Sequence, residues 1–232
     1  MSTKRGKKGD ILLEMKDIRI DGFSDERWHK IIRGIDLTLH RGEVMGLIGE
    51  SGAGKSTLGL ASMGFTKPGC KITSGSVVFD GKDLVTASED EKRALWGTRI
   101  AYVAQSAAAS FNPAHRLLNQ TVEASLNQNL QSRDLAEADA RDLYKQLQLP
   151  DPENIGDRYP HQVSGGQLQR MMTAMAMSPR PDLIIFDEPT TALDVTTQVE
   201  VLVAMRAIVE KFNTAALYIT HDLAVVAQMA DI

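Results

Sequence analysis

The chain has 232 residues, of which 43% are hydrophobic and 24% are charged, as in an ordinary globular protein. Its net charge of −4 at neutral pH argues against a general nucleic-acid-binding surface, so no nucleic acid is expected as a partner. Cys70 is the single cysteine, which excludes an intrachain disulfide and fits a reducing cytoplasm. At this length we expect one domain, with or without a subdomain.

Residues 1–10 are predicted to be a flexible basic tail. They hold four positive charges among small and polar residues: Lys4, Arg5, Lys7 and Lys8. A solvated tail is favoured over binding to anionic lipid or RNA. The sequence shows no signal-peptide core and no stretch long enough to span a bilayer, so we expect any membrane role to come through a partner. Residues 11–232 are predicted to form a single domain.

The first half of that domain predicts strands followed by strand–helix alternation. Alternating apolar and polar residues predict antiparallel strands over 11–20 and 31–39, joined by a polar loop over 21–30. The short strands and helices predicted next cover residues 44–48, 58–63, 75–81, 92–96 and 100–104.

The middle of the chain predicts an inserted helical subdomain over about residues 106–179. A small, polar loop over 106–113 precedes helices over 117–130 and 134–149. Several prolines then break the pattern before a further helix opens at 163–167. We interpret four methionines of this helix as core residues rather than a metal site: Met171, Met172, Met175 and Met177.

The last third predicts a return to α/β alternation. The apolar run 183–186 is typical of a buried parallel strand. An amphipathic helix over 199–212 and a strand over 215–220 follow, and a short helix is expected over 223–230. Residues 11–105 and 180–232 are therefore predicted to form an α/β core with a mixed or parallel sheet and an N-terminal antiparallel subdomain.

A glycine-rich loop between the strand 44–48 and the following helix has the G-x4-G-K-S pattern of a phosphate-binding loop. Its glycines allow backbone N–H groups to face one anion, Lys55 is placed to reach the β- and γ-phosphates, and Ser56 to bind Mg²⁺. A plain glycine-rich turn is the weaker alternative. The predicted nucleotide-binding residues are Gly49, Glu50, Ser51, Gly52, Ala53, Gly54, Lys55, Ser56 and Thr57.

Polar residues end three predicted strands, and they suggest catalytic roles. Asp187 is predicted to hold Mg²⁺ and Glu188 to polarise the attacking water. Gln105 is a candidate contact for Mg²⁺ or that water, and His221 for the γ-phosphate. Taken singly, each of these residues has an ordinary alternative as a turn or capping residue.

A second anion-binding turn is predicted at a helix start, where Ser164, Gly165, Gly166 and Gln167 follow one another. One chain would then carry two separate phosphate-binding sites. Two copies arranged head-to-tail would pair each phosphate loop with the other copy's serine–glycine turn more simply than one chain folding back on itself.

In this order, GESGAGKST, Gln105, VSGGQ, LIIFDEP, Asp194 and His221 resemble the motifs of the ATP-binding-cassette (ABC) ATPase domain, over nearly the whole chain. The segments around Tyr159 and Thr190 resemble the oligopeptide, dipeptide and nickel branch of bacterial importers. The resemblance implies a phosphate-loop NTPase with a RecA-like core, ATP and Mg²⁺ as cofactors, Glu188 as catalytic base and Asp194 at a dimer seam.

The resemblance also implies partners and a location. They are transmembrane permease subunits, a second ABC cassette and, indirectly, a solute-binding protein, with the chain at the cytoplasmic face of the cell membrane and a small, peptide-like solute imported. An aromatic residue before the phosphate loop is expected to stack on adenine, with Trp28 the first candidate and Phe23 the second. The alternatives are a soluble ABC ATPase acting on ribosomes or DNA, and a nucleotide-gated module without catalysis.

Two departures from the family pattern stand out. Val163 replaces the usual leucine before the serine–glycine turn, a mild change expected to preserve it. The sequence ends at Ile232, soon after His221, where family members continue, so we expect a truncated C-terminal end or the first half of a tandem protein.

Overall fold

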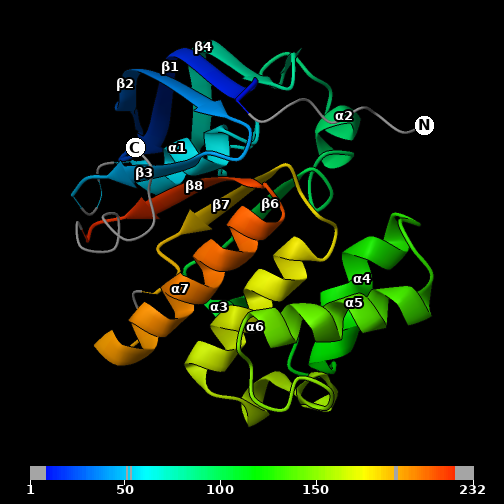
Figure 1. Ribbon diagram of the computed structural model, residues 1–232. Coiled ribbons are helices and arrows are strands. Elements are labelled where there is room, and N and C mark those ends of the chain that lie inside the picture. The colour runs from blue at the N-terminus through cyan, green and yellow to red at the C-terminus, as the bar shows by residue number, and fades with distance from the viewer. Residues whose placement is uncertain (1–8, 51, 53, 191–192, 223–232) are drawn as a thin grey trace.

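The computed structural model describes residues 9–50, 52, 54–190 and 193–222. Its strands form two four-stranded sheets, an antiparallel one in the order β2-β1-β4-β5 and a parallel one in the order β3-β8-β7-β6 (Figure 1). The strands are β1 (Ile11–Ser24), β2 (Arg27–His40), β3 (Val44–Ile48), β4 (Cys70–Phe79), β5 (Lys82–Asp83), β6 (Ile100–Val103), β7 (Leu183–Asp187) and β8 (Ala215–Thr220). Residues 1–8 of the predicted tail and the predicted helix over 223–230 lie outside the described residues.

Helices fill the segments between the strands of the parallel sheet. They are α1 (Lys55–Ala61), α2 (Glu89–Arg93), α3 (Ala107–Ser110), α4 (Leu117–Asn127), α5 (Arg133–Gln146), α6 (Gly165–Met177) and α7 (Val195–Lys211), with 3-10 turns η1 (Ile155–Asp157) and η2 (Pro160–Gln162). The predicted loop over 106–113 was wrong in part, because Ser106 caps the single turn α3 by accepting a hydrogen bond from the Ala109 N–H at 3.3 Å.

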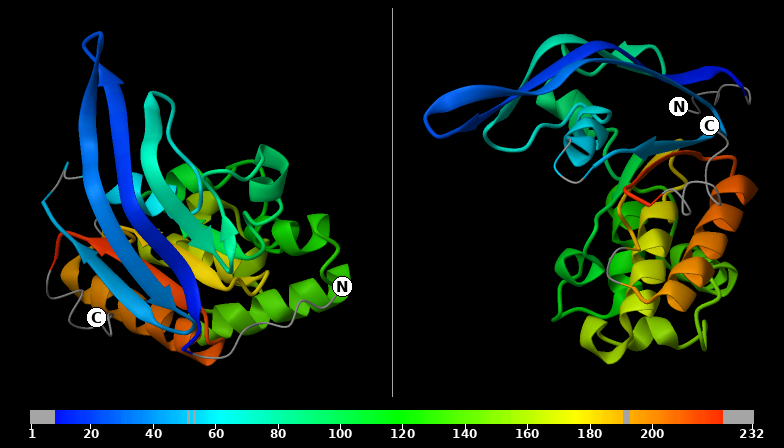
Figure 2. Two further views of the ribbon diagram at one scale, coloured as in Figure 1. Left: turned by 90° about the horizontal axis from the view of Figure 1, so that it is seen from above. Right: turned by 90° about the vertical axis from the view of Figure 1, so that its left-hand side faces the viewer.

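The predicted polar loop over 21–30 was also wrong. Strands β1 and β2 continue through it as a long hairpin, turning at Asp25 and Glu26 with φ of 48° and 59°. Two residues with positive φ match the twist of a tight hairpin, which charged loop composition alone does not reveal. Figure 2 shows this hairpin extending well beyond the rest of its sheet.

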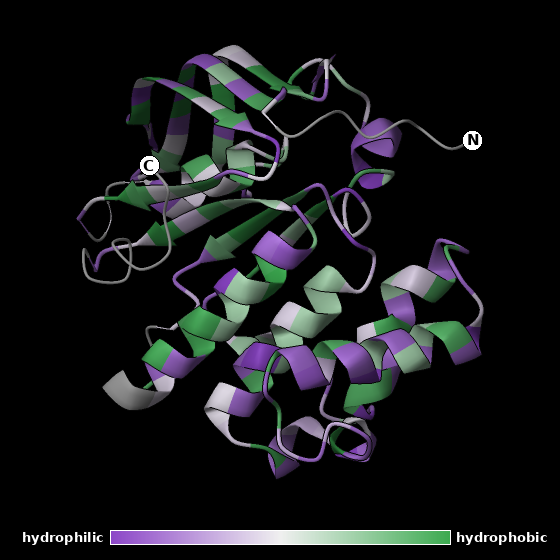
Figure 3. Cartoon of the chain, in the orientation of Figure 1, coloured by the Kyte–Doolittle hydropathy of each residue, from purple (hydrophilic) through white to green (hydrophobic). Residues whose placement is uncertain are grey.

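The parallel sheet is buried on both faces. One face packs with α1 and the antiparallel sheet, and the other with α6 and α7. All five residues of β7 are buried, as its unbroken apolar sequence predicts, and Figure 3 shows apolar residues running along these strands. Burying apolar side chains on both faces fixes the positions of the strand ends that carry the candidate site.

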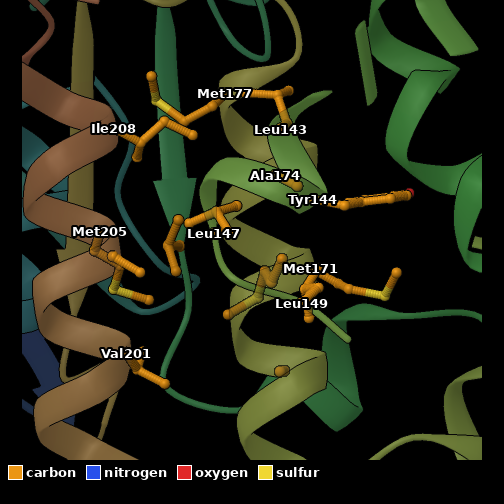
Figure 4. Close-up of a cluster of buried hydrophobic side chains, with 14 of the residues drawn as sticks. Leu143, Tyr144, Leu147, Leu149, Met171, Ala174, Met177, Val201, Met205 and Ile208 are labelled. Carbon is orange, nitrogen blue, oxygen red and sulfur yellow. The ribbon is translucent and has the colours of Figure 1, made fainter. Parts of the chain in front are cut away.

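The predicted core methionines are confirmed. Met171, Met172 and Met177 are at most 1% exposed, and Met175 is partly buried against the same cluster. In Figure 4, side chains of α6 lie between those of α5 and α7. The helices α3 to α6 fall within the segment predicted as a helical subdomain, and the division of the chain into core and subdomain stays a prediction.

None of the helices in the described part of the chain combines the length and the apolar character that crossing a bilayer requires.

Candidate functional site

The phosphate loop runs from the end of β3 into α1. Gly54 caps α1 with φ of 88°, and Gly52 has φ of 83°, values that side-chain-bearing residues rarely adopt. A Cβ added to Gly54 would lie 2.8 Å from Ile32 Cδ1 and 2.9 Å from Ile31 Cγ2. Both conformation and space therefore require glycine at position 54. The predicted loop residues Ser51 and Ala53 lie outside the described residues.

The side chain of Lys55 is hydrogen-bonded to the backbone of this loop. Its side chain is 7% exposed, and its Nζ donates hydrogen bonds to the carbonyl oxygens of Gly49 and Glu50, both at 2.7 Å. The same Nζ lies 4.0 Å from Glu188 Oε1. A buried ammonium needs such partners because leaving it unpaired is costly. Lys55 is thus held as a fixed positive charge at the loop.

A cavity of about 350 Å³ lies against the loop. Its described lining residues come from four separate segments: Ile31, Gly52, Gly54, Lys55, Ser56, Thr57, Gln105 and Glu188. The structure therefore brings together residues that the sequence singled out separately. Ile31 was missed, since an isoleucine in an alternating strand carries no signal of a binding role.

Ser56 and Asp187 meet beside this cavity. The Ser56 hydroxyl donates to Asp187 Oδ1 at 2.8 Å, and the Tyr102 hydroxyl donates to Asp187 Oδ2. Burial, then the hydrogen bond and the charge of Asp187, raise the pKa of Tyr102 well above its usual value, so it stays a donor. A hydroxyl beside a carboxylate is a donor set that suits Mg²⁺. Ser56 and Asp187 therefore fit the predicted Mg²⁺. Tyr102 was not predicted from the sequence to be part of this site.

Glu188 lines the same cavity beside Lys55. It adopts φ of 47°, an uncommon conformation for a non-glycine residue that tends to occur at functional sites. The Ile219 carbonyl accepts a hydrogen bond from its N–H at 2.9 Å. Glu188 Oε2 lies 3.3 Å from His221 Nδ1 and 3.5 Å from Gln105 Nε2. Gln105 and His221, predicted at two other strand ends, thus converge on the carboxylate of Glu188.

The second predicted anion-binding turn lies elsewhere. Ser164 Oγ accepts from the Gln167 N–H at 3.2 Å, and Gln167 Oε1 accepts from the Ser164 N–H at 3.0 Å, which forms a capping box for α6. Ser164 and Gly165 are exposed. Gly166 is buried, and a Cβ there would lie 2.5 Å from Thr197 Cγ2. The described residues lining the phosphate-loop cavity include none of these four.

A family model described as ABC transporter matches residues 32–191. The chain belongs to this family. The match spans the phosphate loop, Gln105, the serine–glycine turn and the strand that carries Asp187 and Glu188. The prediction of an ABC-type ATP-binding domain is confirmed.

Three relatives in this family are named as peptide transport components. The chain is 37% identical to a probable peptide ABC transporter ATP-binding protein of Sinorhizobium fredii, over 98% of this chain and 68% of that protein. It is 37% identical to the oligopeptide transport ATP-binding protein OppD of Lactococcus lactis, over 97% and 66%. It is 42% identical to the dipeptide transport ATP-binding protein DppD of Escherichia coli, over 90% of this chain and 64% of that protein. The chain thus spans about two thirds of the length of these relatives.

Solved ABC structures share the fold. The ATP-binding cassette MJ0796, described as a dimer bound to ADP and Pi, superposes with a TM-score of 0.81 at 24% identity, covering 94% of this chain and 91% of that one. A second structure of MJ0796, also described as dimeric, gives the same values. The predicted α/β fold of an ABC ATPase is confirmed.

Two site predictions for this ABC domain rest on residues away from the phosphate loop. Phe23 and Trp28 pair across the β1–β2 hairpin with ring centroids 5.3 Å apart, and Lys71 Nζ lies 3.8 Å from the Trp28 ring centroid. Neither aromatic residue is among the described lining residues of the cavity. Asp194 caps α7 by accepting from the Thr197 N–H at 3.0 Å. Adenine stacking and the dimer seam stay predictions.

Proposed function

We propose that this chain is the ATP-binding subunit of an ABC importer, which binds and hydrolyses ATP to drive uptake of a small, peptide-like solute. The observation that carries this proposal is the convergence of Lys55, Ser56, Gln105 and Glu188 on one cavity. These residues supply a positive charge, a metal-binding hydroxyl, an amide and a carboxylate, which are the parts that phosphoryl transfer to water needs.

The phosphates of ATP would lie against the glycine loop and Lys55. On binding, the Lys55 ammonium exchanges its bonds to the Gly49 and Glu50 carbonyls for bonds to phosphate oxygens, which adds no unpaired buried charge. Ser56 and Asp187 would hold Mg²⁺, with Gln105 near them. When bound, Mg²⁺ neutralises charge that develops on the phosphates.

Glu188 would act as the general base. Its Oε2 accepts the proton of the attacking water, while His221 and Gln105, both within 3.5 Å of that oxygen, orient the carboxylate. Lys55 Nζ lies 4.0 Å from the other carboxylate oxygen, Oε1, and helps to hold the carboxylate in this position. His221 would also contact the γ-phosphate, and its position 3.3 Å from Glu188 supports this role.

A second cassette would complete the site. The exposed Ser164–Gly165 turn does not line the chain's own cavity, and a head-to-tail pair would place it against the partner's phosphate loop. Asp194 would lie at the seam between the two cassettes. The MJ0796 cassettes, which are described as dimeric, support this arrangement.

Partner membrane subunits would couple this cycle to transport. The names of the peptide transport relatives support a peptide-like solute. We propose permease subunits as direct partners at the cytoplasmic face of the membrane and a solute-binding protein as an indirect one. The helical segment 106–179 would receive the permease contact, and residues 11–105 and 180–232 would form the catalytic core.

The substitution Glu188→Gln tests the catalytic assignment. It keeps the size of the side chain but removes the base, so turnover should fall about 10²- to 10⁴-fold while ATP binding persists. Phosphate release and nucleotide binding measure the two effects. Glu210→Gln, an exposed carboxylate paired with Arg206 on α7, is the matched control and should retain parental turnover. Parental turnover in Glu188→Gln would refute the proposed base.

A further inference from the structure

Strand register places Tyr102 beside Asp187. Strands β6 and β7 are parallel, with Tyr102 opposite Ile185. Because side chains alternate between the faces of a strand, Asp187 shares the face of Ile185. Tyr102 and Asp187 are therefore diagonal neighbours on one face of the sheet, at its carboxyl edge.

The same face carries the helix that follows the phosphate loop. A Cβ added to Gly59 of α1 would lie 2.4 Å from Ile219 Cδ1 and 3.4 Å from Ile185 Cγ2. This close approach of helix to sheet brings Ser56, one turn earlier on α1, to Asp187. Tyr102, Asp187 and Ser56 thus form one short chain of side chains ending at the cavity.

Each carboxylate oxygen of Asp187 has its own donor. Ser56 donates to Oδ1 and Tyr102 to Oδ2, and Asp187 is only 6% exposed. Rotation of the carboxylate about its χ2 angle would break both bonds and leave a buried charge without partners, which is unfavourable. The Tyr102 hydroxyl consequently fixes the plane of the carboxylate, so that one of its two equivalent oxygens faces Ser56.

We infer that Tyr102 is a positioning residue for the divalent cation of the nucleotide site, acting through the orientation of Asp187. This inference rests on the proposed function, because it concerns the cation that accompanies ATP. Partners that orient ligating carboxylates typically change metal affinity about 10- to 100-fold when they are removed. Tyr102 is not among the described residues that line the phosphate-loop cavity. Its removal should therefore change the affinity for the cation rather than the affinity for the nucleotide.

The alternative is that the Tyr102 hydroxyl only satisfies a buried carboxylate. Its removal would then lower the stability of the protein but leave cation affinity unchanged. Tyr102→Phe separates the two, because it deletes the hydroxyl and keeps the ring. Tyr144→Phe is the matched control, since the Tyr144 hydroxyl donates to Thr121 Oγ1 at 2.7 Å within the buried helical region.

The experiment measures Mn²⁺ binding by electron paramagnetic resonance in the presence of ADP, so that no turnover is needed. A fluorescent ATP analogue is titrated separately in EDTA, and circular dichroism checks the fold. We expect the Mn²⁺ dissociation constant of Tyr102→Phe to rise about 10-fold or more, with nucleotide affinity in EDTA within about twofold of the parent. Tyr144→Phe should match the parent in both measurements.

Two results would count against the inference, and they are distinguishable. If the parent binds Mn²⁺ with ADP and Tyr102→Phe binds it equally well, the positioning role is overturned and the proposed function stands. If the parent itself binds neither nucleotide nor Mn²⁺ with ADP, the proposed function fails and the inference fails with it.

Discussion

A ring of four charged side chains joins the two sheets at the end away from the phosphate loop, and it offers a sharp test of stability. Arg99 Nε lies 2.7 Å from Asp182 Oδ2, and Arg99 Nη2 lies 2.6 Å from Asp80 Oδ2. Arg41 pairs with Asp80 and lies 3.6 Å from Asp182. The side chains of Arg41 and Asp182 are 6% and 5% exposed. Removing either buried charge would therefore leave the other incompletely paired.

We predict that Asp182→Asn lowers the free energy of unfolding by about 3 kcal/mol. Breaking a buried ion pair by removing one partner costs about 3–5 kcal/mol, and the lower end applies because Asp80 still neutralises Arg41 and Arg99. Urea unfolding at pH 7 followed by circular dichroism measures the change, with an unaltered m-value showing that the same surface unfolds.

The control for this prediction is an exposed ion pair. Glu210 and Arg206 on α7 lie 2.8 Å apart with side chains 57% and 32% exposed, and such pairs contribute about 0–1 kcal/mol. Glu210→Gln should stay within that range. If Asp182→Asn cost no more than this control, the buried ring would not hold the sheets together as argued.

Two further predictions concern adenine binding and the loss of stability at acidic pH. Trp28→Ala should weaken ATP binding about 5- to 150-fold, since base–aromatic stacking contributes roughly 1–3 kcal/mol, and Phe23→Ala should weaken it less. Unchanged equilibrium binding of ATP in both variants would exclude the hairpin from adenine recognition. Burial raises the pKa of Asp80, but hydrogen bonds from Arg99 and Arg41 outweigh it and lower the pKa below its usual range. The stabilisation is thus complete above the ordinary pKa of aspartate and is lost as pH falls through the folded-state value. Thermal unfolding of the parent and of Asp80→Asn from pH 7 to pH 3 should therefore show a stability difference that shrinks, and a constant difference would contradict the assignment.

Local patterns predicted most of the elements but few of their exact ends. The buried strand over 183–186 was found because a continuous apolar run needs two covered faces. The hairpin turn was missed because Asp25 and Glu26 adopt positive φ without glycine or asparagine to indicate it. Gly166 was predicted as part of an anion-binding turn, yet it also has a packing role that only its neighbour Thr197 reveals.

The sequence by itself determined the chemistry of the phosphate loop. Glycines at positions 52 and 54, followed by Lys55 and Ser56, define a short segment whose conformation depends on local backbone freedom. The strand ends that precede Gln105 and Glu188 were also predictable, because the run of apolar residues that marks a buried strand ends where the strand leaves the core.

Only the tertiary structure decided which of these residues meet. Ser56 reaches Asp187 across 131 residues of sequence, and Tyr102 reaches it across 85. Both contacts follow from the order β3-β8-β7-β6 and from the packing of α1 on one face of that sheet. Strand order and face are set by the burial of the whole core rather than by any local pattern. For this reason the phosphate loop was recognisable from sequence, whereas the role of Tyr102 emerged only from the folded chain.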